Sequence, residues 1–179
     1  MIFEKTKLND AYIIRPERLE DDRGFFARVW CQKEFEQHGL VSNLAQCNIS
    51  YNKSRGTLRG MHYQEKPYEE TKLVRCTAGA IVDVIIDIRS KSSTFGQWIS
   101  VELSAENRTM LYVPQGFAHG YVTLVDDTEV FYQVSEFYSP GVEGGIRWND
   151  SFFQIVWPIN ENLVISEKDS TWPDYRHSK

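Results

Sequence analysis

Histidine is the side chain best able to exchange protons near neutral pH, and this chain of 179 residues contains four. His62 has the most suggestive setting, because it lies in a strand-like segment, residues 58–64, that also carries Arg59. Such a histidine could act as a general base, although a lone histidine is more often a hydrogen-bonded core residue. His38, in an expected helix, and His177, in the polar tail, are interpreted as solvated bystanders.

The second candidate, His119, ends a Pro-x-Gly-x-x-His pattern at residues 114–119. This spacing resembles the second motif of cupin barrels, in which a tight turn presents a histidine to the barrel interior. The first cupin motif would place another histidine two residues after His62, and none is there. A metal site would keep His62, His119 and perhaps Glu69 or Glu70, which is thin support for a tightly held cation. We therefore expect a cupin-type barrel that has lost its metal.

A group of basic residues lies in or beside strand-like segments rather than on a solvated helix face. One such cation usually forms a structural ion pair, whereas several that converge with polar side chains would form an anion site. Arginine side chains suit a diphosphate well, and the spacing alone leaves open whether they converge. The residues are Arg23, Arg59, Lys72 and Arg75, with the polar candidates Gln46, Asn48 and His119.

The elements that must position these side chains are mostly strands. Short β-branched runs alternate with turn residues such as Gly, Pro and Asn, which is typical of an all-β sandwich or barrel. The run at residues 80–88 is apolar enough to be buried on both faces. The expected strands are residues 80–88, 97–103, 110–113 and 128–138.

Helices are expected to be minor. A short helix at residues 33–38 would stop at Gly39, and a capped turn or short helix would follow Ser166. The length is enough for one domain with a core of its own, spanning residues 1–179.

The composition excludes several classes of protein. The net charge is −5, without a basic stripe, which argues against nucleic acid as a partner. No run of about 18 apolar residues occurs, so we expect no membrane span, and residues 1–10 lack the pattern of a secretion signal. The three cysteines have no Cys-x-x-Cys spacing, which suits a reducing cytoplasm rather than a disulfide framework.

A series of short motifs runs in a fixed order from Arg15 to Asp169. The motifs are DRGFF at 22–26, LRGMHYQ at 58–64, KLVR at 72–75, SSTFG at 92–96, LSAEN at 103–107, GFAHG at 116–120, YSP at 138–140, RWND at 147–150, WP at 157–158 and SEKD at 166–169. Together they resemble the 3,5-epimerase family of nucleotide-linked 4-keto-6-deoxy sugars, the family of dTDP-4-dehydrorhamnose 3,5-epimerase. One motif would be a weak signal, whereas this many in one order is a strong one.

The resemblance implies a cupin-type jelly-roll barrel, a homodimer whose N-terminal strands exchange between subunits, and catalysis without a metal or redox cofactor. His62 corresponds to the general base that removes the proton beside the sugar ketone, and Asp169 to the carboxylate that orients it. Tyr132 corresponds to the acid that reprotonates the opposite face, and Lys72 to the cation beside the enolate. The implied substrate-binding residues are Arg23, Phe26, Arg28, Gln46, Asn48, Arg59, Lys72, His119, Glu143 and Lys168.

These roles are chemically consistent. A ketone acidifies the C–H bonds on both neighbouring carbons, because the electron pair left behind can rest on the ketone oxygen as an enolate. An ammonium stabilises that charge as it develops, and inversion needs an acid on the face opposite the base. Without the family pattern, the default would be a packed barrel aromatic for Tyr132, a surface lysine for Lys72 and a helix N-terminal acid for Asp169.

Two positions depart from the family pattern. Arg28 stands where the rhamnose-pathway enzymes usually carry a Glu, and Cys47 replaces the Asp of a Gln-Asp-Asn segment. Both changes concern substrate recognition, so the nucleotide base and the exact sugar stay open. Without an adjacent base motif, Cys47 is interpreted as a packing residue rather than a nucleophile.

The sequence predicts an epimerase of a nucleotide-diphosphate-linked 4-keto-6-deoxyhexose that inverts C3, C5 or both, in rhamnose-type deoxysugar biosynthesis. The nearest alternatives are a single-centre epimerase of the same family and an enzyme for another nucleotide. The remaining alternatives are a sugar-binding cupin without turnover and a metal-dependent cupin. Binding alone needs no acid–base pair, so the joint presence of four candidate residues favours an enzyme; they are His62, Lys72, Tyr132 and Asp169.

Overall fold

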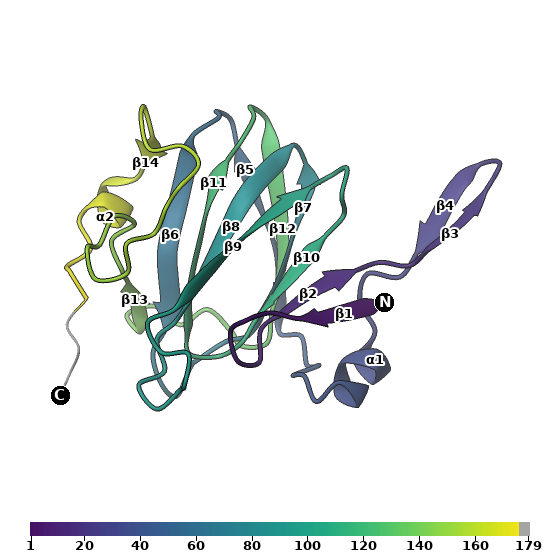
Figure 1. Cartoon of the computed structure of the whole chain (residues 1–179), viewed down its shortest axis with the longest axis horizontal. Helices are drawn as coiled ribbons and strands as arrows, with labels where there is room; N and C mark the ends of the chain where they lie inside the picture. The colour runs from purple at the N-terminus through teal and green to yellow at the C-terminus, as the bar shows by residue number, and fades with distance from the viewer. Residues whose placement is uncertain (176–179) are drawn as a thin grey trace.

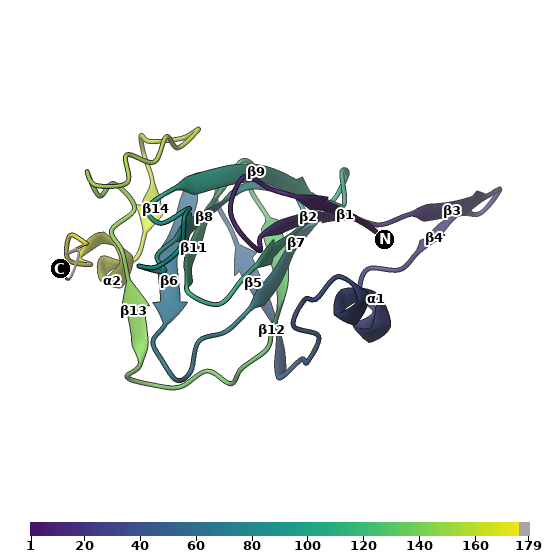
Figure 2. The same cartoon turned by 60° about the horizontal axis from the view of Figure 1, so that its bottom comes forward.

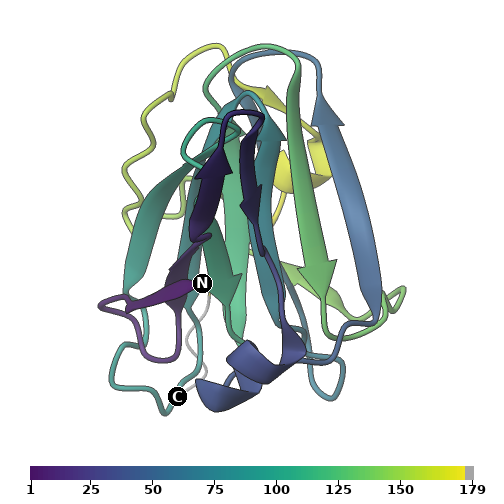
Figure 3. The same cartoon turned by 90° about the vertical axis from the view of Figure 1, so that its right-hand side faces the viewer.

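A computed structural model describes residues 1–175, in which the strands form two facing sheets and a separate hairpin (Figure 1). His177 lies outside the described residues. Figure 3 shows the strands of the two sheets on either side of a common interior. Two largely antiparallel sheets closed around one core form a jelly-roll barrel, so the predicted all-β class is confirmed.

Pairing between strands that are distant in the sequence builds both sheets. The first sheet has the order β1-β2-β10-β7-β12-β5 and the second the order β13-β6-β11-β8-β9, with β14 added in parallel beside β6. The first consists of β1 (Ile2–Lys5), β2 (Tyr12–Arg15), β10 (Met110–Val113), β7 (Lys72–Ala78), β12 (Thr128–Val134) and β5 (Gln46–Asn52). The second consists of β13 (Glu143–Gly145), β6 (Thr57–Gln64), β11 (Phe117–Thr123), β8 (Ala80–Asp87), β9 (Trp98–Ser104) and β14 (Val164–Ile165).

The two short helices are confirmed close to their expected positions. α1 (Gln32–Gln37) is followed by Gly39, whose φ of +69° is the left-handed conformation that ends a helix. α2 (Glu167–Ser170) is capped by Ser166, whose Oγ accepts a hydrogen bond from the backbone amide of Asp169 at 3.0 Å. Within the described residues, neither helix is long and apolar enough to cross a membrane.

A two-stranded arm projects from the barrel, on the side away from α2 (Figure 1, Figure 2). It is formed by β3 (Arg18–Asp21) and β4 (Gly24–Ala27), which, within the described residues, pair only with each other. Its apolar side chains are exposed, with Leu19 at 69% and Phe26 at 66% of their accessible surface. An isolated hairpin is at best marginally stable in water, so this arm needs a surface to pack against.

Three of the four expected strands are confirmed to within one residue at each end, as β8, β9 and β10. The fourth, expected to run to Tyr138, is wrong beyond Val134, because the backbone leaves the sheet there and finds other partners. The Ser135 amide donates to the carbonyl of Thr71, and the Tyr138 amide donates to the side chain of Gln46. The turn therefore brings Tyr138 toward β5 rather than extending β12.

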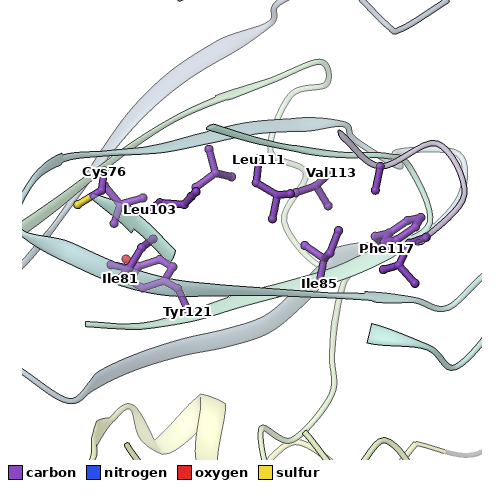
Figure 4. Close-up of a cluster of buried hydrophobic side chains, with 12 residues drawn as sticks. Cys76, Ile81, Ile85, Leu103, Leu111, Val113, Phe117 and Tyr121 are labelled. Carbon is purple, nitrogen blue, oxygen red and sulfur yellow. The ribbon is translucent and has the colours of Figure 1, made fainter. Parts of the chain in front are cut away.

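An apolar core fills the space between the two sheets (Figure 4). Leu111 and Val113 of β10 enter it from the first sheet, and Ile81 and Ile85 of β8 enter it from the second. Each is almost fully buried, and burying such a side chain stabilises the fold by roughly 1.5–3 kcal/mol.

The other face of β8 is covered by the C-terminal segment. Val84 and Ile86 belong to a second buried cluster that includes Phe153 and Trp157. This double burial explains why the sequence of β8 is nearly all apolar, as expected. The C-terminal segment is consequently fixed on the outside of the second sheet, where α2 can reach β6.

Candidate active site

A cavity of about 130 Å³ lies between the two sheets and is lined by six of the site residues predicted from the sequence. Its walls come from β5, β6, β7, β12 and β13, so both sheets contribute. A base, a cation and a phenol share this cavity. The lining residues are Gln46, Asn48, His62, Tyr63, Gln64, Glu70, Lys72, Tyr132, Val134, Tyr138 and Glu143.

A local irregularity in β6 turns both Arg59 and His62 toward the barrel interior. In a regular strand, residues three apart point to opposite faces. Here β6 shifts its register against β11, so that Arg59 pairs with Tyr121 and His62 pairs with His119, two residues apart. Gly60 lies at the shift with φ +118°, and a Cβ there would come within 2.6 Å of the β11 backbone. Only glycine fits this close approach.

His62 is held by a carboxylate from the far end of the chain. Its Nε2 lies 2.6 Å from Oδ1 of Asp169, which α2 carries to β6. Burial alone would raise the pKa of Asp169. The hydrogen bond from His62, with further contacts from Gly60 and Ser166, outweighs the effect of burial, so the pKa of Asp169 lies below its usual range. A charged carboxylate fixes the imidazole tautomer with the proton on Nε2, which leaves Nδ1 as the nitrogen that can accept a proton.

The ammonium of Lys72 is fixed in the same cavity. Its Nζ lies 3.1 Å from Oε1 of Glu70, and the two side chains are only 13% and 12% exposed. Both line the cavity wall at the start of β7. A lysine held in this way presents positive charge to the position where an enolate oxygen would develop.

Tyr132 stands on the wall opposite His62, because β12 belongs to the first sheet and β6 to the second. Burial raises the pKa of Tyr132 above its usual value, and the charge of Glu70 raises it further, while Arg59 acts in the opposite direction. The phenol is therefore protonated at neutral pH and can donate a proton.

Polar groups also gather at the mouth of the cavity. Glu143 forms an ion pair with Lys168, which holds the pKa of the Glu143 carboxyl below its usual range, and the Tyr138 hydroxyl also bonds to Glu143. Gln46 lines the cavity, and its Oε1 accepts a hydrogen bond from the backbone amide of Tyr138 at 2.8 Å. These residues connect β13, α2 and β5 around the opening.

Two predicted binding residues, Arg59 and His119, do not line the cavity. Arg59 donates through Nε to Oδ1 of Asn52 at 2.8 Å. His119 is buried, with Nε2 2.7 Å from Oδ1 of Asp83. Within one chain, Arg59 is exposed beside the cavity and His119 is buried beneath it.

Three predicted binding residues lie on the arm or directly after it, outside the cavity of their own chain. Arg23 and Phe26 are exposed on the hairpin, and Arg23 is paired with Asp21. Arg28 follows the hairpin, and its Nη1 lies 3.2 Å from Oε1 of Glu34. The structure of a single chain therefore does not bring these three residues to the other candidates.

The alternative metal set is not assembled. His62 is bonded to Asp169, His119 is bonded to Asp83, and Glu70 is paired with Lys72. In residues 1–175, no group of three His, Cys, Asp or Glu side chains is arranged to hold a metal ion. The possible ligands instead take part in separate hydrogen-bonded pairs.

A larger cavity of about 780 Å³ adjoins the first and shares Tyr63 and Gln64 with it. None of His62, Lys72 and Tyr132 lines this larger cavity. Size therefore does not identify the reactive site, and the position of the acid–base groups does.

Five lining residues had no assigned catalytic or binding role in the sequence-based prediction: Tyr63, Gln64, Glu70, Val134 and Tyr138. Gln64 could have been found, because it lies two residues after His62 on the same strand and therefore on the same face. Glu70 was considered only as a metal ligand, and its sequence position gives no sign of the ion pair with Lys72. Tyr138 was placed in a strand, and its position depends on a turn that the pattern does not show.

An all-β barrel that places a histidine–carboxylate pair, an ammonium and a phenol around one cavity defines a cupin-type enzyme for acid–base chemistry. The family model described as dTDP-4-dehydrorhamnose 3,5-epimerase matches residues 5–177. The dTDP-4-dehydrorhamnose 3,5-epimerase of Sinorhizobium fredii is 43% identical over 173 residues, which are 97% of this chain and 89% of that protein. The crystal structure of dTDP-4-dehydrorhamnose 3,5-epimerase from Elizabethkingia anophelis has a TM-score of 0.95 and 43% identity, and covers 98% of this chain and 96% of that one. The chain belongs to the dTDP-4-dehydrorhamnose 3,5-epimerase family.

A further structure shows that the fold is shared by enzymes with different outcomes. ChmJ, a 3'-monoepimerase from Streptomyces bikiniensis in complex with dTDP-quinovose, has a TM-score of 0.88 and 31% identity, and covers 96% of this chain and 86% of that one. The protein is an epimerase of nucleotide-linked 4-keto-6-deoxyhexoses that acts at C3, C5 or both. The predicted family, fold class and activity are confirmed.

Proposed function

We propose that the protein inverts both C3 and C5 of a dTDP-linked 4-keto-6-deoxyhexose, with His62 as the base and Tyr132 as the acid. The observation that carries the proposal is the position of these side chains on opposite walls of one cavity, which Lys72 also lines. A cytoplasmic location belongs to the same proposal, because the odd number of cysteines suits a reducing compartment.

The proposed reaction is a proton transfer across the sugar ring. Nδ1 of His62 takes the proton from a carbon beside the ketone, and the C–H electron pair moves onto the ketone oxygen to give an enolate. Lys72 stabilises this oxygen, and Asp169 stabilises the imidazolium that forms. Tyr132 then delivers a proton to the opposite face of the carbon, as the electron pair returns from the oxygen. Exchange with water restores His62 and Tyr132.

The proposed binding of substrate uses the mouth of the cavity. Lys168 and Arg59 supply positive charge, and Gln46, Asn48 and Glu143 supply hydrogen-bonding groups on the lining or beside it. A protein with net charge −5 must concentrate cations locally to hold a diphosphate. Binding at the mouth would leave the sugar inside the cavity, beside the base and the acid.

A homodimer completes the proposal. On the outer face of the first sheet, Ile49 and Tyr51 are 63% and 55% exposed. The guanidinium of Arg75 lies over the ring of Phe131 on that face, and its buried Nε has no partner among the described residues. A second copy would cover these groups, would support the arm, and would place Arg23 at the neighbouring cavity.

We expect a mass of about twice 20.9 kDa by light scattering. Ile49→Lys should shift the protein toward the single-chain mass, because a charge would be buried in the contact without a partner. Val156→Lys is the matched control, since Val156 is 74% exposed on the C-terminal segment. A wild-type protein that runs as a single chain at all concentrations would contradict the dimer.

The reaction itself is tested by NMR in D₂O with dTDP-4-keto-6-deoxyglucose. Deuterium should enter at both C3 and C5, because each carbon lies beside the ketone. Uptake at C3 alone would instead identify a 3-epimerase, as for ChmJ. Parallel assays with UDP-, CDP- and GDP-linked sugars test the nucleotide, which the departures at Arg28 and Cys47 leave open. No uptake with any 4-keto nucleotide sugar would overturn the proposed function.

A further inference from the structure

Glu70 is a carboxylate inside the cavity that the proposed reaction does not use. It lies two residues before Lys72, lines the cavity, and is only 12% exposed. Its Oε1 is 3.1 Å from the ammonium of Lys72. A buried charge without partners would destabilise the fold, so the groups that Glu70 contacts indicate its role.

Gln64 fixes the other side of this carboxylate. Gln64 is buried, and its Nε2 lies 3.4 Å from Oε2 of Glu70 and 3.0 Å from the carbonyl of Tyr68. Its Oε1 accepts a hydrogen bond from the backbone amide of Ser139 at 2.9 Å. Gln64 therefore ties the segment before β7 to the segment after β12, and Glu70 is held at both of its oxygens.

This arrangement has two effects on the groups proposed for catalysis. Lys72 has three N–H donors, and because one is directed to Glu70, the other two are oriented by that contact. The negative charge of Glu70 also opposes ionisation of the Tyr132 phenol, which contributes to the raised pKa of Tyr132. A neutral phenol is the form that can donate a proton.

We propose that Glu70 is a positioning residue of the epimerase, which holds the Lys72 ammonium toward the reacting ketone and adds a negative charge to the cavity that the Tyr132 phenol also lines. This inference rests on the proposed roles of Lys72 and Tyr132. It adds an acidic residue to the reaction site without giving it a direct contact with the sugar.

Other charges face the same phenol and must be held constant in a test. Lys72 comes from β7, Arg59 and His62 from β6, and Glu143 from β13. Behind them, α2 supplies Lys168 and Asp169, and the turn after β12 supplies Tyr138. Glu70→Gln changes none of these groups and retains an oxygen that can accept the hydrogen bond from Lys72.

The test is a pH titration of the protein labelled with ¹³C at Cζ of its nine tyrosines. The resonance of Tyr132 is identified by its loss in Tyr132→Phe. In Glu70→Gln it should titrate at a lower pH than in wild type, because the charge that opposes ionisation has been removed. Glu69→Gln is the matched control: it removes the same charge one residue away, beside Lys66 and outside the catalytic cavity, and should leave the titration unchanged.

Activity measurements separate the positioning of Lys72 from the effect of the Glu70 charge on Tyr132. Glu70→Ala should lower kcat roughly tenfold with little change in KM, because the loss of a hydrogen bond to a charged group typically has an effect of this size. Glu70→Gln should recover part of the lost kcat, because its amide oxygen can still accept the hydrogen bond from Lys72. A Tyr132 resonance that titrates at the same pH in wild type and Glu70→Gln would overturn the inference. The same shift in Glu69→Gln would overturn it as well. If the resonance moves as expected but wild type exchanges no substrate proton, the coupling is supported and the proposed function fails.

Discussion

His62→Ala is expected to lose roughly 10²–10⁴-fold in epimerisation, the usual effect of removing a positioned base. Deuterium uptake from D₂O should fall at C3 and C5 together, because one base serves both carbons in the proposed reaction. NMR of the substrate in D₂O measures both positions in one experiment. Asp169 would then remain buried without the imidazole, so a thermal melt must accompany the assay.

A matched control and a rescue make this result specific. His38→Ala removes a histidine at the end of α1, where its Nδ1 lies 2.8 Å from the carbonyl of Glu34, and should keep wild-type exchange. Added imidazole should partly restore exchange to His62→Ala, because it can occupy the space that the side chain leaves. Exchange at the wild-type rate in a folded His62→Ala protein would show that another group is the base.

Tyr132→Phe should separate proton removal from inversion. The phenylalanine ring keeps the packing of β12 but has no hydroxyl to donate, so inversion should fall by roughly 10²–10⁴-fold. His62 would still remove the proton and return deuterium to the same face. NMR should therefore detect deuterium in the unchanged sugar, together with very little inverted product.

The control for this variant is Tyr68→Phe, on the exposed loop before β7. It removes a hydroxyl outside the cavity and should retain wild-type exchange and inversion. If Tyr132→Phe inverts the sugar at the wild-type rate, the phenol is not the acid. If exchange and inversion fall together by the same factor, Tyr132 acts before or during proton removal.

The sequence predicts the strands well where the pattern and the burial agree. The strand at 80–88 is apolar on both faces because the core covers one and the C-terminal segment covers the other. The arm is different, since its apolar residues Leu19 and Phe26 stay 69% and 66% exposed in the described part of the chain. The end of the strand predicted to reach Tyr138 also fails, because the partners of that backbone are the Gln46 side chain and Thr71. Neither partner is visible in local alternation.

Prediction from local sequence patterns has the same limit at the candidate site. His62 and Tyr132 are recognisable from the family motifs, and the roles assigned to them stay predictions. The ion pair of Lys72 with Glu70 depends on the conformation of the segment before β7, which no periodicity reports. The inward orientation of both Arg59 and His62 depends on a register shift at Gly60, which a regular alternation would exclude.

The contact between His62 and Asp169 joins residues that are 107 positions apart, and Asp169 follows every strand of both sheets in the chain. Ribosomal synthesis therefore completes all of the barrel strands before it adds the carboxylate that orients the base. A nascent chain can form both sheets and still lack catalytic activity. The appearance of activity during refolding would consequently require the docking of α2 on β6 as well as the formation of the barrel.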